Sequence, residues 1–574
     1  MARHFVARVD RFTGLDCLSP READRLPGAS PDMLNFSVTA DGKLEKRRGY
    51  EYMFASTAAL RGIWCGRLGD RDLYVAVFGG RLFVSGISFR EMLPVPGAVP
   101  GADPVEIFPF WGKLYLLTGS GIFCTEGDSL APIEPYEPLL TTATAPSGEG
   151  VVVDEINALT PKVYQKYVPD GTSTHYHLAV RNVASIDRIC RGGADVSDDA
   201  WYWDTASRTV TFLNAPLAGG DDLEIHYSVT QDDPDLAGRV LRCRHAVTFG
   251  GANDTRVFLY GCDDAPAMRY HSGMAAGVPC MGYFPALGYT QVGDGSPITG
   301  MLRHYDRQLI FTEKAAYYST LEYVTEPDGR RRAIFPVLPL ADGRGNEAVA
   351  QPLLMENEPV TWDRNGLFRW VSTNVRDERN AQCFSFAVNA HLAGWDLSRA
   401  VLFNRRSTGE LFAVCGTDVL VYRYGTGSFY PYKISGSPIR FMREWEGETY
   451  FGTGDAVCRV TGWRDGSSEV EACWHSSFTA VDAPDLEKNL YSGEICVDTG
   501  EGGAECRVSV KGIDGALAAE GRWIIPATGG VKRRRMPLRY DHFERMQVKL
   551  TSSGNVPVRV SFLTLRGKVT DKIV

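Results

Sequence analysis

The chain has 574 residues, of which 44% are hydrophobic and 23% are charged, and this ordinary globular composition excludes a disordered protein. Its formal net charge of −9, from 61 basic and 70 acidic residues, argues against a protein coated by nucleic acid over its whole surface. No stretch approaches about 18 consecutive apolar residues, so we expect no membrane anchor. The N-terminus has no long apolar core and no small-residue cleavage site, so we expect no signal peptide.

The thirteen cysteines are odd in number, and no two of them form a Cys-x-x-Cys pair. Disulfide frameworks and structural zinc sites show closer, paired spacing. We therefore predict mostly buried free thiols, made in a reducing cytoplasm. We also predict no metal and no cofactor.

Residues 1–56 are predicted to form an extended arm that carries one β-hairpin. A short run of strand-forming residues at 34–39 is followed by Asp41-Gly42, a strong signal for a tight turn. The segment has no helical period, no nucleophile and no metal ligands in a useful order. A structural role is therefore expected for it.

Residues 57–140 and 234–486 repeat one pattern. Each repeat has a turn residue, an apolar strand, a short Gly/Asp/Lys loop and a second apolar strand, as in residues 71–85 and 409–423. The repeats recur at roughly 40–50 residues, within the range of propeller blades, which bury their faces by stacking around an axis. We predict an all-β fold containing a β-propeller of six or seven blades; several unrelated sandwiches that share this hairpin pattern are the alternative. The candidate blades lie near 57–90, 103–138, 238–275, 297–340, 347–390, 395–440 and 441–480.

Two segments depart from this rhythm. Residues 141–233 contain several short strands between turn clusters, and residues 223–227 alternate apolar and polar side chains, which predicts an inserted β-sandwich domain. Residues 487–574 contain further strand patterns. They predict a C-terminal β domain or a closing blade.

Candidate catalytic and metal-binding residues are few. His175 and His177 lie two apart on one predicted strand and share a face, but no third metal ligand follows at a telling distance. Asp363 and Asp396 could form the carboxylate pair of a glycan-cleaving propeller, although 70 acidic residues offer many such pairs. The sequence has no Gly-x-Ser-x-Gly elbow and no Walker-type phosphate loop. We therefore predict that the protein is not an enzyme.

Two basic runs are candidates for contact with DNA or with a neighbouring subunit. The denser run is Lys532, Arg533, Arg534 and Arg535, and the other is Lys46-Arg47-Arg48. Basic side chains that line a channel can bind phosphates without reading sequence. The alternative is an edge strand or loop whose charges prevent aggregation or meet an acidic neighbour.

The N-terminal segment resembles structural proteins of tailed bacteriophages, namely the tail nozzle, tail-tubular and tail-hub or stabilisation proteins of short-tailed phages. The residues that carry the resemblance are SPDMLN (30–35), DGKL (41–44) and RRGY (47–50). The inserted domain adds a second likeness, at residues 208–212 and 225–227, to a small β-module of phage tail proteins. Together these motifs cover about 50 N-terminal residues and about 60 of the insertion.

The resemblance implies a β-propeller that carries inserted β-domains and assembles into a ring, implied to be hexameric, around the path of DNA exit. It implies a virion tail location after synthesis in the host cytoplasm, and as partners other tail or portal/adaptor proteins, tail fibres and the genomic DNA. A strand pair before the first blade can close a propeller by adding a strand to the last blade, or it can lie against a neighbouring subunit. Asn35, Arg47 and Arg48 are therefore candidates for a subunit interface or a DNA channel.

Two other functions remain open from the sequence. A tail-tip adhesin or carbohydrate-binding propeller would expose clustered aromatic residues, for which Trp201 and Trp203 are candidates, although such a pair can equally belong to a sandwich core. A glycan-cleaving propeller would bring carboxylates together in its funnel.

Overall fold

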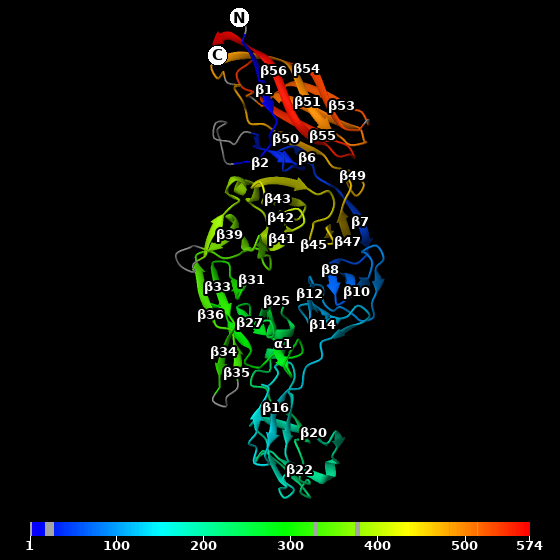
Figure 1. Cartoon of the computed structure of the whole chain (residues 1–574), viewed down its shortest axis with the longest axis vertical. Helices are drawn as coiled ribbons and strands as arrows, with labels where there is room; N and C mark the ends of the chain where they lie inside the picture. Colours follow the sequence, from blue (N-terminus) through cyan, green and yellow to red (C-terminus); the bar gives the residue numbers. More distant parts are fainter. Residues whose placement is uncertain are drawn as a thin grey trace. The chain divides into compact units, whose positions relative to one another are not determined.

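The computed structural model describes residues 3–17, 28–326, 331–372, 379–481, 483–513, 515–527 and 529–573. The chain divides into two compact units, one formed by residues 1–79, 83–94 and 345–574, and the other by residues 80–82 and 95–344. Strands dominate both units, and the two α-helices of the described part are short, α1 (Leu236–Leu241) and α2 (Asn389–Leu392). The predicted all-β fold of propeller type, with an inserted β-sandwich and additional C-terminal β-structure, is confirmed (Figure 1).

The first unit contains four-stranded antiparallel sheets of the blade type. In the sheet β41-β42-β43-β44, three glycines with φ near +66° (Gly409, Gly416 and Gly427) stand at the three turns. Glycine adopts this left-handed conformation without the Cβ penalty of other residues, so the turns fix the register of the strands between them. The strands are β8 (Leu60–Leu68), β9 (Arg71–Phe78), β10 (Arg81–Ser85) and β11 (Leu93–Pro94); β37 (Leu353–Met355), β38 (Glu358–Asp363), β39 (Gly366–Ser372) and β40 (Arg379–Cys383); and β41 (Ala400–Arg405), β42 (Glu410–Cys415), β43 (Asp418–Arg423) and β44 (Ser428–Lys433).

One more sheet of this unit joins the two ends of the repeat region. Its first three strands are consecutive, but the fourth, β7, comes from the N-terminal arm and pairs antiparallel with β47, with Phe54 opposite Val457 and Tyr50 opposite Val460. An early strand therefore completes a sheet made late in the chain. The strands are β45 (Phe441–Trp445), β46 (Glu448–Gly452), β47 (Ala456–Val460) and β7 (Tyr50–Ala55), followed by β48 (Arg464–Asp465) and β49 (Ser468–Glu469).

The same unit holds a C-terminal pair of sheets with an apolar core. A Cβ on Gly493 of β51 would lie 3.3 Å from Trp523 of β53, which shows that the faces of the two sheets pack closely. One sheet has β5 (Phe36–Val38), β6 (Leu44–Lys46), β56 (Arg559–Ile573), β51 (Leu486–Asp498) and β54 (Val531–Phe543), with β1 (Arg3–Val9) also on β56. The other has β4 (Met33–Leu34), β50 (Ala472–His475), β55 (Gln547–Ser553), β52 (Ala504–Lys511) and β53 (Leu517–Ile525). In a separate two-stranded sheet, β2 (Gly14–Leu15) pairs in parallel with β3 (Ala29–Ser30).

The N-terminal arm thus adds strands to three sheets that also hold later strands of the chain. The predicted hairpin, β5–β6, is present with Gly42 at φ +77°, but it pairs with β56 of the C-terminal domain. The strand that joins the last blade-type sheet is the next one, β7.

The second unit contains three further blade-type sheets. Each is an antiparallel sheet of four strands. With the three four-stranded sheets of the first unit and the six-stranded sheet that β7 joins, seven blade-type sheets lie among the described residues. They are formed by β12 (Glu106–Phe110), β13 (Lys113–Leu117), β14 (Ile122–Thr125) and β15 (Leu130–Pro132); by β25 (His245–Gly250), β26 (Thr255–Tyr260), β27 (Met268–His271) and β30 (Tyr289–Gln291); and by β31 (Gly300–His304), β32 (Arg307–Phe311), β33 (Ala315–Thr320) and β36 (Val337–Asp342). Two small hairpins accompany them, β28 (Gly273–Ala275) with β29 (Val278–Cys280) and β34 (Glu322–Thr325) with β35 (Arg331–Ile334).

The inserted domain of this unit consists of a six-stranded and a three-stranded sheet. The rings of Tyr167 and Tyr176, one from each sheet, meet edge to face at 5.5 Å within a common apolar core. The larger sheet has β17 (Val151–Val152), β16 (Leu139–Thr144), β18 (Lys162–Tyr167), β24 (Leu223–Val229), β20 (Val183–Arg191) and β21 (Ala194–Asp195), and the smaller has β19 (His175–His177), β23 (Thr209–Phe212) and β22 (Trp201–Asp204).

We predict that Gly49→Ala destabilises the first unit by about 3 kcal/mol or more, because a Cβ there would lie 1.9 Å from the backbone oxygen of Arg464. Gly454→Ala is the matched control, since nothing lies within 4 Å of its Cβ position. Thermal unfolding of both variants checks this. Equal midpoints would contradict the close backbone packing at Gly49.

Candidate functional site

The arginine of the RRGY motif is buried and fully bonded. Arg47 is 3% exposed at its side chain, and its guanidinium forms a two-pronged ion pair with Asp465, with N–O distances of 2.8 and 2.6 Å. The remaining N–H groups donate to Asn35 Oδ1 at 2.7 Å and to the backbone oxygens of Arg48 and Lys433. All five donors of the guanidinium therefore have acceptors, which offsets the cost of burying its charge.

Asn35 contacts Arg47 and holds the segments around it together, and it does so from a strained backbone position. Its φ is +58°, a conformation that asparagine tolerates better than most residues. Its Oδ1 accepts from Arg47 and from the backbone N–H of Lys433, and its Nδ2 donates to the backbone oxygen of Glu471. One side chain thus connects the arm, the end of β44 and the segment before β50.

The residues that follow Arg47 extend this junction into the last blade-type sheet. Tyr50 donates to the backbone oxygen of Ser435 at 2.7 Å and packs edge to face against Phe451. Asp465 accepts a further bond from the backbone N–H of Ser435. Gly49 exchanges backbone hydrogen bonds with Gly462 and Thr461. We call residues Met33–Ala55 with these partners the clasp.

The residue before Arg47 ties the clasp to the C-terminal domain. Lys46 is 1% exposed, its Nζ donates to the backbone oxygen of Gly554, and its backbone N–H donates to that of Val558. Burial lowers the pKa of this amine to about 8. The predicted basic run Lys46-Arg47-Arg48 is therefore largely internal.

The structure places the three N-terminal candidates differently. The carboxylate and backbone groups that Asn35 and Arg47 bind belong to their own chain, whereas Arg48 is exposed. The guanidinium of Arg48 lies over the ring of Trp463, 4.9 Å from its centroid. Arg48 alone among these three presents its side chain to solvent.

The C-terminal basic run lies on β54, an edge strand of its sheet. Arg533 and Arg535 point to the outer face, where Arg533 and Arg566 both contact the buried carboxylate of Glu494. These two guanidiniums hold the pKa of Glu494 below its usual value. The guanidiniums of Arg533 and Arg8 also lie over the ring of Phe562, at 5.6 and 4.3 Å from its centroid.

Lys532 and Arg534 alternate with these residues and point toward the opposite face. Charges on an edge strand discourage pairing with a further strand. β54 is thus an edge strand on which Arg533 contacts an acidic side chain of its own chain. We call the outer side of β54, β51, β56 and β1, with Arg8, Arg533, Arg535 and Arg566, the basic face.

The remaining sequence candidates take ordinary structural roles. Trp201 and Trp203 pack against the core of the inserted domain, while Tyr202 between them is exposed. Asp363 and Asp396 accept backbone hydrogen bonds in their own turns, from Asn365 and Ser398 respectively.

The sequence also bears on His175 and His177 as metal ligands, on the state of the cysteines and on the presence of a membrane helix. His175 and His177 are exposed and each contacts a threonine hydroxyl, and the described residues contain no group of three or more potential ligands that could hold a metal. All thirteen cysteines are free and none is exposed, as predicted. No helix in the described ranges is both long and apolar enough to cross a bilayer.

Sequence reasoning missed the acidic partners of the arginines. Asp465 and Glu494 are two of 70 acidic residues and follow no motif. Asp465 lies 418 residues from Arg47, so only the fold brings them together.

Comparisons with known proteins found no matching family model and no matching curated protein. Among solved structures, the chain is similar to the CNH domain of AfRom2 (10% identity, 72% of this chain and 100% of that chain, TM-score 0.36). It is also similar to apo AztD from Citrobacter koseri (9% identity, 76% and 96%, TM-score 0.26) and to an exo-β-1,3-galactanase from Phanerochaete chrysosporium (10% identity, 80% and 95%, TM-score 0.17). At these identities and scores, none of them bears on what this chain does.

We predict that Arg47→Met accelerates hydrogen exchange in β7 and β47 by about a hundredfold, because it leaves the buried Asp465 carboxylate uncompensated at a cost of about 3 kcal/mol or more. Arg48→Met is the matched control, since that side chain is exposed. Mass spectrometry of peptides that cover residues 44–55 and 456–466 measures the effect. Equal exchange in the two variants would show that the ion pair does not hold the clasp.

Proposed function

We propose that this chain is a structural protein of a tailed-bacteriophage virion, a ring-forming nozzle or hub in the tail conduit through which the genome leaves. The observation that carries the proposal is the place of the segment on which the family resemblance rests. Residues 33–50 of that segment are built into the clasp, where Asn35, Arg47 and Tyr50 bind other parts of the chain. A motif whose residues bind other parts of their own chain has a structural role.

The architecture suits a mechanical role. The clasp connects a blade-type sheet to the C-terminal β domain through a buried ion pair and backbone hydrogen bonds, and loss of one partner of such a pair is strongly destabilising. Head-to-tail interfaces between identical copies form a closed ring when the rotations from one copy to the next add up to a full turn. Six copies is the number that the resemblance implies.

The basic face supplies a surface for a polyanion or an acidic neighbour. Arg533 is 64% exposed at its side chain although it contacts Glu494, so its remaining donors are open to solvent. Arg535 is exposed beside it on the same face. We propose that these two residues meet the phosphates of the passing genome, without reading its sequence.

The proposal includes the partners and the location that the resemblance implies. Copies of the chain contact one another and the portal or adaptor proteins of the tail, and tail fibres are further neighbours. The protein is made in the host cytoplasm and resides in the virion tail.

We predict a closed ring of about six copies for the purified protein, alone or after addition of the neighbouring tail components. Native mass spectrometry and light scattering measure the copy number. A chain that stays monomeric with every virion component would overturn the proposal.

We predict that Arg533→Glu with Arg535→Glu weakens binding to double-stranded DNA and flattens its salt dependence by about two units of slope, because two phosphate contacts are lost. Arg522→Glu is the control, because it makes the same charge reversal at one exposed arginine of the same domain. Like Arg533, Arg522 contacts a glutamate. Filter binding at several salt concentrations measures the slope. An unchanged slope would show that DNA does not bind the basic face. An acidic protein would then be the proposed partner of this face.

A further inference from the structure

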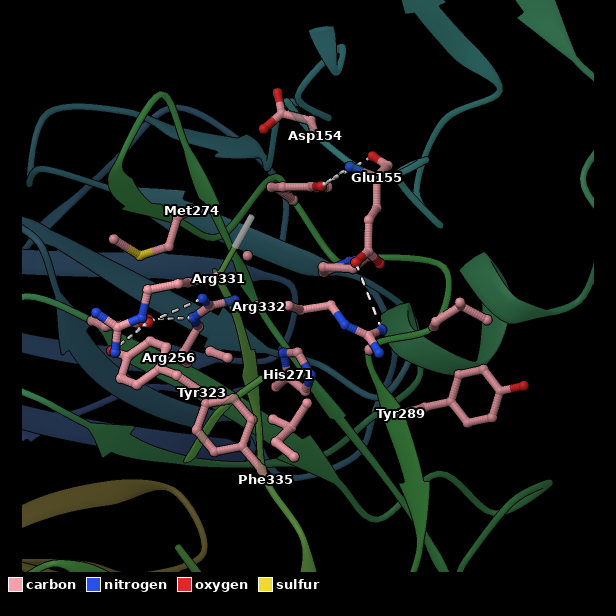
Figure 2. Close-up of a pocket in the computed structure, with 18 of the residues that line it drawn as sticks. Asp154, Glu155, Arg256, His271, Met274, Tyr289, Tyr323, Arg331, Arg332 and Phe335 are labelled. Atoms are coloured by element: carbon pink, nitrogen blue, oxygen red, sulfur yellow. Dashed lines mark hydrogen bonds and ion pairs between the residues drawn. The ribbon is translucent and has the colours of Figure 1, made fainter. Parts of the chain in front are cut away.

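The second unit contains a cavity of about 800 Å³ that neither the clasp nor the basic face uses. Its walls come from the segment after β17 at the root of the inserted domain, from β26, β27 and β30, and from the hairpin β34–β35 (Figure 2). This volume lies within the range of about 300–1,000 Å³ that is typical of small-molecule sites.

One wall is held rigid by a bonded set of polar side chains. Arg256 is buried, its Nε donates to Asp254 at 2.5 Å, and its Nη1 donates to the backbone oxygen of Ser272. The hydroxyl of Tyr323 donates to the other carboxylate oxygen of Asp254 at 3.2 Å. These groups are fixed before any ligand arrives, which lowers the entropic cost of binding.

A neutral histidine forms the floor beside this wall. His271 packs between the rings of Phe258 and Phe335, at centroid distances of 5.6 and 5.0 Å, and burial lowers its pKa to about 3. Its Nδ1 lies 3.1 Å from the backbone oxygen of Ser272, so this nitrogen carries the proton. The other ring nitrogen, Nε2, is then a hydrogen-bond acceptor.

The rim of the cavity combines aromatic faces with charged groups. Tyr289 and Tyr323 are 42% and 46% exposed, which leaves ring surface free for stacking. The guanidinium of Arg331 lies 4.7 Å from the ring centroid of Tyr323. Arg332 contacts Glu155 at 3.8 Å across the cavity edge, as Figure 2 shows.

The lining carries balanced charge. Three arginines and three carboxylates line it, namely Arg256, Arg331 and Arg332, and Asp154, Glu155 and Asp254. A polyanion needs an excess of positive charge, and a metal ion needs converging anionic ligands. This lining offers donors, acceptors and apolar ring faces in one space, which suits a neutral molecule rich in hydroxyl groups.

We infer that this cavity binds a neutral oligosaccharide. Sugar hydroxyls donate to the carboxylates and to His271 Nε2 and accept from the arginines, while the apolar faces of two sugar rings of the oligosaccharide stack on Tyr289 and Tyr323. The inference does not depend on the tail proposal, because it concerns a single chain.

The test uses the full-length protein and an array of neutral and acidic oligosaccharides that includes the gluco, galacto, manno and N-acetylhexosamine series. We expect binding to neutral members of the array. Tyr323→Ala and Tyr289→Ala should each weaken it about tenfold by titration calorimetry, through loss of ring stacking. Tyr202→Ala is the matched control, since it removes a tyrosine of similar exposure that lies outside the cavity.

Three outcomes would overturn the inference. They are failure to bind any neutral glycan at millimolar concentration, preferential binding of acidic glycans, and binding that Tyr202→Ala weakens more than Tyr323→Ala. Unchanged thermal unfolding of the three variants ensures that a loss of binding reports the cavity. A monomeric protein that passes this test would still count against the ring proposal.

Discussion

The first unit depends on one buried ion pair. Arg47 and Asp465 are almost completely removed from water, and such a pair is tolerated only when every polar group around it is bonded. Asn35, Ser435 and the carbonyl groups of Arg48 and Lys433 complete that requirement. The pair thereby fixes where the N-terminal arm crosses from one sheet to another. Without it, β5–β6 and β7 would lose the common anchor between them.

The basic face and the cavity are also built from side chains that contact one another. The basic face lies on the long strands of the C-terminal domain, and its exposed guanidiniums are ordered by Glu494 and Phe562. The cavity of the second unit is likewise built on sheet residues and on a buried arginine. In both places the side chains that could meet a partner are positioned by other side chains and not by loops alone.

The sequence predicted what short-range patterns determine. Alternating apolar strands and glycine turns established the blade-type sheets, and Asp41-Gly42 established the hairpin β5–β6. Burial of Arg47 was not predictable, because a basic residue in a basic run is usually solvated and its partner is 418 residues away. The cavity was missed for a similar reason: Glu155, His271 and Tyr323 come from three separate segments and form no motif. The exposure of Trp201 and Trp203 was left open, and packing within the inserted domain decided it.

The sharing of the N-terminal arm has a consequence for the order of events during synthesis. Strands β1, β4, β5–β6 and β7 pair with β56, β50, β56 and β47, so each of them waits for a partner that is made roughly 400 or more residues later. Phe54 meets Val457 only after roughly 400 further residues are made, which takes about 20 to 80 seconds at ordinary elongation rates. Throughout that interval the arm carries unpaired strand edges. The first unit therefore completes its fold only after strands beyond residue 456 have been made, whereas the second unit draws on residues 80–82 and 95–344 and is able to fold while those strands are still being made.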